Sequence, residues 1–300
     1  MKYLKLIIVL YLISNNLLLK AQPKAYSLQF EGQLIGWTNG NFNDHFSHQW
    51  GIRYIPELFA EYKLNEIWTL DAAASVNSYG AITFYNDGRR DNGELKPYRF
   101  WARLSSKQFE LRAGLQKINF GSASILRPLM WFDRLDPRDP LQLTDGVYGL
   151  LGRYYFLNNA NIWIWGLYGN AEKRGWDLLA SDKKIPEFGG RIQTPAGRGE
   201  IALSYHHRNI GKGSFILPDI GVPLYYERFS QDRLAIDGKW DLGVGLWFEN
   251  SIEKNQKSII PGQKWNNQFN LGTDYTFGLG NGLNVKIEHL VWLSSDDLFK

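Results

Sequence analysis

The chain has 300 residues, of which 44% are hydrophobic and 21% are charged, and its mean hydropathy is -0.34. It contains no cysteine, which excludes both disulfide bonds and a lipid-modified N-terminal cysteine. The net charge is +4, but loss of Lys2, Lys5 and Lys20 with a leader would lower it to about +1, which gives no basis for nucleic-acid binding. Aromatic residues reach 15%, and 12 of them are tryptophan, a content typical of side chains at membrane interfaces.

The N-terminus has the layout of a secretory signal peptide. Lys2 and Lys5 precede an apolar run over residues 6–13, and Ala21 offers a small residue at a cleavage point. The alternative is a membrane anchor, but the run is interrupted at Ser14 and falls well short of the ~20 apolar residues that a spanning helix needs. We therefore expect a signal peptide over 1–21 and a single β-barrel domain over 22–300.

After Gln22, apolar and polar residues alternate with a period of two, which predicts β-strands. The clearest case is 265–277, where Phe269, Leu271 and Tyr275 alternate with polar residues. The strands are long enough to cross a bilayer at a tilt. We predict thirteen of them, near 26–37, 48–63, 66–79, 95–105, 107–116, 146–156, 160–169, 187–195, 199–208, 231–240, 243–253, 264–277 and 283–293.

The connections between these strands alternate between short and long. The short ones lie near 64–65, 105–106, 157–159, 195–198, 241–242 and 278–282, and the long ones near 38–47, 80–94, 117–145, 170–186, 209–230 and 254–263. Outer-membrane barrels have short periplasmic turns and long external loops, whereas a soluble β-sandwich has no reason for this alternation. The sequence thus predicts an all-β fold, an antiparallel transmembrane β-barrel.

The thirteenth strand leaves the C-terminus on the side of the long loops. Single-chain bacterial barrels usually have an even number of strands. Either one strand is miscounted, or the sequence lacks its C-terminal strands. We favour the second interpretation, in which the complete barrel has 14–18 strands and 283–293 does not pair with 26–37.

The longest loop, 117–145, has an apolar centre that includes Leu129, Met130, Trp131 and Phe132. Loops of this length in compact proteins are usually functional. Folding the loop into the barrel is the simplest way to remove these side chains from water. The strand at 160–169, which is apolar on both faces, is expected to contact such an inward loop or a partner subunit.

The segment from Leu111 to Gly121 resembles the strand-to-loop signature of porin-like and export-type barrels. In these proteins a glycine-bearing strand leads to a Trp-Gly or Phe-Gly pair, here Phe120-Gly121, and a loop rich in Asp-Pro follows, here Asp136-Pro137 and Asp139-Pro140. The likeness covers some 45 residues. It implies the arrangement of general diffusion porins, in which a constricting loop between the fifth and sixth strands directs acidic residues at a row of arginines.

The candidate pore-lining and constriction residues follow from alternation and from this resemblance. They are Arg99, Arg103, Arg112, Arg153 and Arg191 on the wall and Asp133, Asp136 and Asp139 on the loop. Opposite charges across a narrow aqueous gap create a transverse field that sorts polar solutes. The alternative is a closed lumen filled by salt bridges, which suits barrels of fewer than about ten strands better.

Enzymatic interpretations are weaker. The sequence has no Gly-x-Ser-x-Gly motif, and alternation puts Ser204 and His206 on one face but supplies them no acidic partner. His45 and His48 form a His-x-x-His pair with no third ligand cluster. We therefore expect no enzyme, no metal and no cofactor.

The sequence predicts an outer-membrane porin-like channel for passive passage of small polar solutes, constricted by the inward-folded loop 117–145. Its partners would be the lipid bilayer of the outer membrane and these solutes, without nucleic acid; a homo-oligomer is left open. The alternative is a non-conducting outer-membrane barrel that binds or anchors surface polysaccharide or a partner protein. Its binding surface would use aromatic residues such as Trp131, Phe132, Tyr225 and Tyr226.

Overall fold

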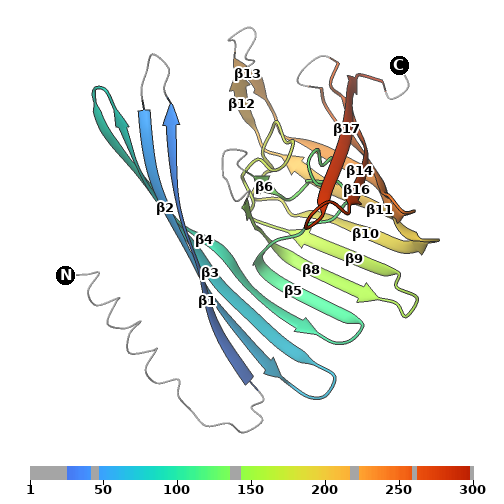
Figure 1. Ribbon diagram of the computed structural model, residues 1–300. Coiled ribbons are helices and arrows are strands. Elements are labelled where there is room, and N and C mark those ends of the chain that lie inside the picture. Colours follow the sequence, from blue (N-terminus) through green and yellow to red (C-terminus); the bar gives the residue numbers. More distant parts are fainter. Residues whose placement is uncertain (1–25, 42–46, 136–142, 217–222, 259–261, 298–300) are drawn as a thin grey trace.

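The computed structural model describes residues 26–41, 47–135, 143–216, 223–258 and 262–297. Within these residues a 13-stranded antiparallel sheet dominates the molecule (Figure 1). The predicted all-β, antiparallel architecture and the strand number are therefore confirmed. The predicted signal peptide lies outside the described residues. No helix in the described ranges combines the length and hydropathy needed to cross a membrane.

The strands of the sheet neighbour one another in chain order. They are β1 (Tyr26–Asn41), β2 (Ser47–Lys63), β3 (Thr69–Tyr85), β4 (Gly88–Ser105), β5 (Phe109–Gln116), β8 (Val147–Tyr155), β9 (Asn161–Leu167), β10 (Glu187–Ala196), β11 (Gly199–Ile210), β14 (Phe229–Asp241), β15 (Gly245–Asn255), β16 (Trp265–Phe277) and β17 (Leu283–Ser295). Two small hairpins lie in the long connections: β6 (Arg134–Leu135) with β7 (Thr144–Asp145), and β12 (Gly213–Ile216) with β13 (Pro223–Tyr226).

The two faces of the sheet have opposite chemistry. In β11, Ser204 and His206 are almost fully buried while the alternating Leu203 and Tyr205 are 51% and 40% exposed. In β16, Asn270 is completely buried while Leu271 is 54% exposed. The period-two pattern thus turns polar residues toward the concave side and apolar residues outward, the reverse of a water-soluble sheet.

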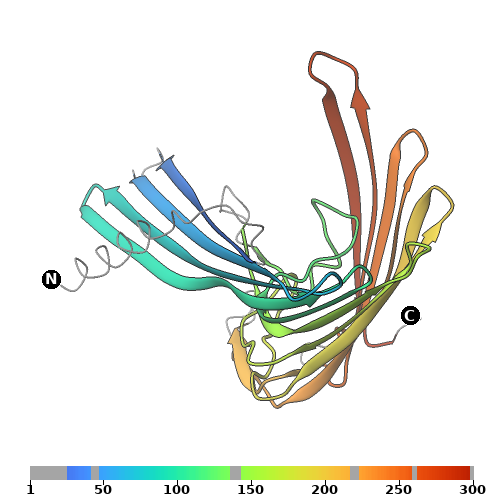
Figure 2. The same cartoon turned by 90° about the horizontal axis from the view of Figure 1, so that it is seen from below.

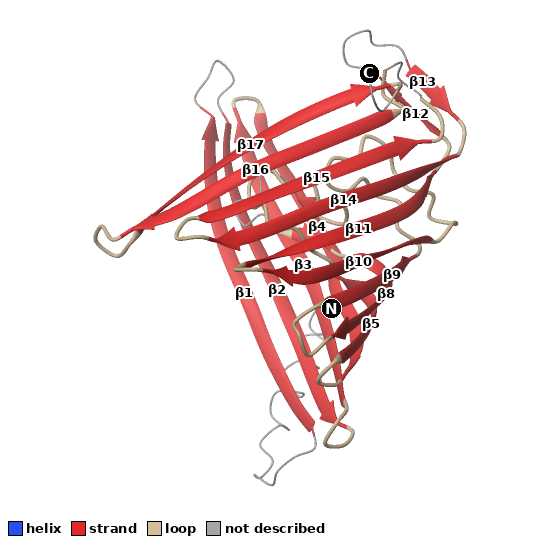
Figure 3. Cartoon of the chain, turned by 90° about the vertical axis from the view of Figure 1, so that its right-hand side faces the viewer, coloured by secondary structure: helices blue, strands red, loops and turns tan. Residues whose placement is uncertain are grey.

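Most connections are short or long as predicted, with two exceptions. The predicted long connection 38–47 is reduced to residues 42–46, because β1 continues to Asn41 and stays paired with β2 up to Ser47. The prediction of a long loop over 80–94 is wrong. Strand β3 continues to Tyr85 and β4 begins at Gly88, and the two strands pair antiparallel along their length up to this turn. Strand pairing there satisfies backbone groups that a loop would leave to solvent. Elsewhere tight turns join the strands, as at Gly243 and Asn159, both of which adopt a positive φ. Figure 3 shows the strands from β5 to β17 lying side by side between these connections.

The sheet is strongly curved but open. β1 pairs with β2 alone and β17 with β16 alone, so the described residues contain no pairing between the first and last strands. Figure 2 shows β1 and β17 as two separated edges, with the segment after β5 projecting into the concave side. The wall and this segment together form the candidate site.

Candidate functional site

The segment between β5 and β8 buries its apolar centre against the wall. Leu129, Trp131 and Phe132 are 2%, 3% and 3% exposed, whereas Met130 is only half-buried. They form one core cluster with Ile118 and Phe120 of the same segment and with wall residues Val147, Leu151, Trp165, Leu167 and Ala235. The predicted removal of this segment's centre from water is thus observed. Each such side chain contributes about 1.5–3 kcal/mol.

Aromatic contacts explain why β9 is apolar on both faces. Trp165 stacks on Phe120 with 5.6 Å between ring centroids and meets the edge of Phe132 at 5.4 Å. On the other face Ile164 is 66% exposed. The expectation that this strand contacts the inward segment is confirmed, and His206 of β11 completes the contact at 5.0 Å from the Phe132 ring.

Two carboxylates on distant strands hold the backbone of the same segment. Glu249 of β15, which has no exposed surface, accepts hydrogen bonds from the amides of Ala123 at 2.7 Å and Leu129 at 3.2 Å. Glu288 of β17 accepts from the amides of Ser124, Ile125 and Leu126 at 2.8, 3.1 and 2.6 Å. These hydrogen bonds tie residues 123–129 to the opposite end of the sheet, and a carboxylate that accepts several amides, as Glu288 does, makes strong bonds. We refer to residues 123–129 as the anchored loop.

The Phe-Gly pair has a physical role in this attachment. Gly121 adopts a φ of +93°, and a Cβ added to it would lie 2.3 Å from Oε1 of Glu249. Any larger residue would be strained and would displace the carboxylate. Similarly, Gly114 of β5 has a φ of +119° and packs against the Phe100 carbonyl, where a Cβ would lie 2.2 Å from the oxygen.

The predicted arginines lie on the concave wall, but most pair with wall carboxylates. Arg103 contacts Asp71 at 2.7 Å, and Arg112 contacts Glu110 at 2.9 Å. Arg153 lies 3.6 Å from the same Glu110 and 3.8 Å above the Trp163 ring.

Two further wall arginines complete this picture. Arg191 pairs with Asp237 at 2.6 Å and also donates to Ser204. Arg99 donates to the carbonyl of Thr144 at 3.0 Å, and the Arg191 guanidinium lies 5.2 Å from the centroid of the Phe120 ring, so both of these predicted arginines touch the long segment.

The approach of Asp133, Asp136 or Asp139 to the wall arginines stays a prediction, but the ion pair that Asp133 forms is with another residue. Asp133 is buried and pairs with Arg127 of its own segment at 2.7 Å. Arg127 and Asp133 are only six residues apart in the sequence, so they can pair whatever the alignment of the segment with the wall strands. The segment thus neutralises the charge of Asp133 itself. Asp136 and Asp139 lie outside the described residues. The pore-lining role of the eight residues stays a prediction.

A second connection, residues 168–186, also lies on the wall. Its Asp177 contacts Arg208 at 2.5 Å and also pairs with Arg233. Burial would raise the pKa of Asp177, but Arg208, Arg233 and Arg174 outweigh it and hold the pKa below its usual value. Arg174 in turn contacts Glu187 at 2.5 Å. Sequence reasoning missed Asp177, Glu187 and Glu249.

The structure tests individual residues of two alternatives from the sequence, a nucleophile pair and an aromatic binding surface. Ser204 accepts a hydrogen bond from Arg191, while His206 contacts Glu187 and Trp165, so the two form no nucleophile and base pair. Trp131 and Phe132 are buried, so they do not offer a binding surface for polysaccharide. Tyr225 is 80% exposed on the β12–β13 hairpin. His45 lies outside the described residues, and His48 contacts Thr38.

The structure thus defines a class: an all-β sheet with a polar concave face, an apolar convex face and an anchored loop. No family model and no curated protein matches the chain. Solved structures similar to it include the outer membrane protein OmpT of Vibrio cholerae in its trimer form, at 10% identity, covering 90% of this chain and 89% of that one, with a TM-score of 0.41. OprB of Pseudomonas putida is 12% identical over 88% of this chain and 74% of that one, with a TM-score of 0.45. OccK5 of Pseudomonas aeruginosa is 11% identical over 90% and 93%, with a TM-score of 0.37.

Proposed function

We propose that the chain is an outer-membrane porin-like channel, non-enzymatic, for passive passage of small polar solutes, and that residues 1–21 are its signal peptide. The observation that carries the proposal is the inverted sheet, with buried Arg208, Arg233 and Gln268 on one face and exposed Leu203, Leu234 and others on the opposite face. A convex surface of this kind needs lipid, because large exposed apolar patches are costly in water.

The same geometry favours an aqueous path over a filled lumen. A sheet of 13 strands is wider than barrels whose interiors are filled by side chains alone. The segment 117–145 narrows the concave side in this proposal, and Arg99, Arg103, Arg112, Arg153 and Arg191 line the path. Asp71 and Glu110 offset only part of the charge of Arg103, Arg112 and Arg153, so this group of five side chains has one positive charge in excess.

Two measurements test this proposal. Full-length protein is produced with its leader, and membranes are separated by density; recovery of the mature chain with the outer membrane is expected, and recovery in the soluble periplasm would refute the location. Detergent-solubilised mature protein is then added to a planar lipid bilayer. Stable conductance steps with a preference for anions are expected, and an intact folded protein that inserts without conductance would refute the channel.

A further inference from the structure

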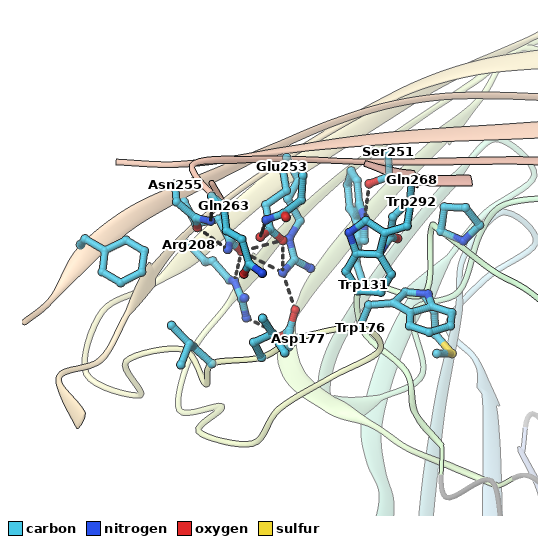
Figure 4. Close-up of a pocket in the computed structure, with 18 of the residues that line it drawn as sticks. Trp131, Trp176, Asp177, Arg208, Ser251, Glu253, Asn255, Gln263, Gln268 and Trp292 are labelled. Carbon is cyan, nitrogen blue, oxygen red and sulfur yellow. Dashed lines mark hydrogen bonds and ion pairs between the residues drawn. The ribbon is translucent and has the colours of Figure 1, made fainter. Parts of the chain in front are cut away.

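Beside the anchored loop, the structure contains a cavity of about 70 Å³ between the 168–186 connection and the wall strands β14 to β17 (Figure 4). This volume accommodates about five water-sized groups, which suits one edge of a small ring rather than a polymer. Figure 4 shows the indoles of Trp131, Trp176 and Trp292 at one side, with Ser251 and Gln268 next to them. Arg208, Glu253, Asn255 and Gln263 lie at the other side.

The tryptophans offer apolar faces at the entrance. Trp176 and Trp292 are 36% and 43% exposed and meet edge to face with 5.7 Å between centroids. The indole N–H of Trp176 donates to the carbonyl of Arg127 at 2.8 Å, and that of Trp131 donates to Ser251 at 3.1 Å. Trp131 is only 3% exposed, so Trp176, whose N–H is already bonded, and Trp292 are the indoles that present ring surfaces to an occupant.

The polar side of the cavity is rich in side-chain amides, namely Gln231, Asn255, Gln263, Asn266 and Gln268. Gln268 is 8% exposed, and neither its amide nor that of Gln263 bonds another side chain or backbone group in the described ranges. Neither amide is among the fully buried polar atoms without a partner in the described ranges, so both are accessible from the cavity and free to bond a ligand or water. Each amide can donate and accept at once.

The charges that line the cavity are already compensated by one another. Arg208 donates to Asp177 and Gln231, and Arg233 contacts both Asp177 and Glu253. Lys257 lies at the rim and is exposed. The interior therefore presents donors, acceptors and aromatic faces without an unpaired charge, which is the combination that suits a neutral solute with many hydroxyl groups.

We propose that this cavity binds a neutral saccharide, with a ring face against Trp176 or Trp292 and hydroxyl groups on Gln263 and Gln268. The site deepens the channel function proposed above and rests on it, since the saccharide would be a solute held on its way through the concave side. Paired indole and amide groups would recognise the hydroxyl-rich ring, and the compensated arginines would give no advantage to anions.

Calorimetric titration of the detergent-solubilised mature chain tests this site, with maltose as the neutral probe and citrate as the charged one. We expect saturable maltose binding. Trp292→Ala and Gln268→Leu should each raise the dissociation constant roughly tenfold, because each variant loses one stacking contact or one hydrogen bond. Trp50→Ala is the matched control, because Trp50 is 59% exposed on β2, away from the cavity, and should leave binding unchanged.

Three outcomes would overturn the saccharide site. These are absence of saturable maltose heat, tighter binding of citrate than of maltose, and maltose binding that neither cavity variant weakens although circular dichroism shows both folded. Conductance in planar bilayers is measured on the same preparations. Conductance without maltose binding would refute the site and leave the channel, whereas maltose binding without conductance would refute the channel and leave the site.

Discussion

Replacing Glu288 by Gln should release the anchored loop from β17 without removing a strand residue's bulk. The carboxylate uses both oxygens: Oε1 accepts from Ser124, and Oε2 accepts from Leu126 at 2.6 Å and Ile125 at 3.1 Å. In glutamine one oxygen becomes an NH₂ group, so at least one of these amides would face another donor.

The magnitude follows from these bonds. Hydrogen bonds to a charged acceptor contribute about 1.5–3 kcal/mol and neutral ones about 0.5–1.5 kcal/mol. The variant loses one bond and weakens the others, but Glu288 is only half-buried, so water replaces part of the loss. We expect a cost of about 2 kcal/mol, which corresponds to a roughly 30-fold larger population with the loop detached.

Hydrogen exchange measured by mass spectrometry reads this population directly from the amides of residues 124–126 in the detergent-solubilised mature chain. Their exchange should accelerate roughly 30-fold in Glu288→Gln. Glu200→Gln is the matched control, since Glu200 bonds Gln193 on the wall and should leave these amides protected. Unchanged protection in Glu288→Gln would refute the anchoring role of Glu288.

Three further changes test the site. Gly121→Ala should lower the free energy of unfolding by at least about 1–2 kcal/mol, because φ is +93° and the new Cβ meets Glu249. The control Gly166→Ala should be tolerated in the same thermal unfolding measurement, because a Cβ there would meet nothing within 4 Å. Arg103→Gln with Arg112→Gln should shift the reversal potential in a KCl gradient toward cations, because Asp71 and Glu110 lose their partners; an unchanged potential would remove both from the conducting path. The pKa of Asp177 in the folded protein lies below its usual value of about 3.8. The ion pairs of Asp177 therefore stabilise the fold fully above pH 3.8, and this stabilisation is lost only as the pH falls through the folded pKa. Proteolysis of 168–186 by pepsin should therefore begin only in strong acid, and at milder pH in Asp177→Asn; equal onset would contradict the ion pairs.

The sequence alone was sufficient for the strands, their order and the burial of the loop centre. Period-two alternation identifies which residues share a face, and short turns force neighbouring strands to pair antiparallel. The run Leu129 to Phe132 was predicted to leave water because it is too apolar for a solvated loop. The stretch 80–94 was misjudged because its glycines and charges suit a loop, although the same residues also extend a hairpin.

Partners across the sheet were harder to predict because alternation gives the face of a side chain without its register. Asp71 stands directly opposite Arg103 in the β3–β4 pairing, and Arg103 stands opposite Arg112 in β4–β5. Counting back from the predicted turn at 105–106 would have placed Gln108 opposite Arg103, because β4 continues to Ser105 and β5 begins only at Phe109. No local pattern connects Glu249 or Glu288 to residues 123–129, because these contacts join positions more than 110 residues apart.

The two kinds of charged contact imply that loop attachment and selectivity are separable. The anchored loop is held through its backbone by Glu249 and Glu288, while the wall arginines take their partners mainly from the wall. Detaching the loop should therefore widen the path but leave the charges of Arg103 and Arg112 in place. Conductance should rise in Glu288→Gln with little change in ion preference, whereas the double arginine variant should alter preference at nearly constant conductance. Joint changes of both quantities in either variant would show that loop and wall act as one constriction.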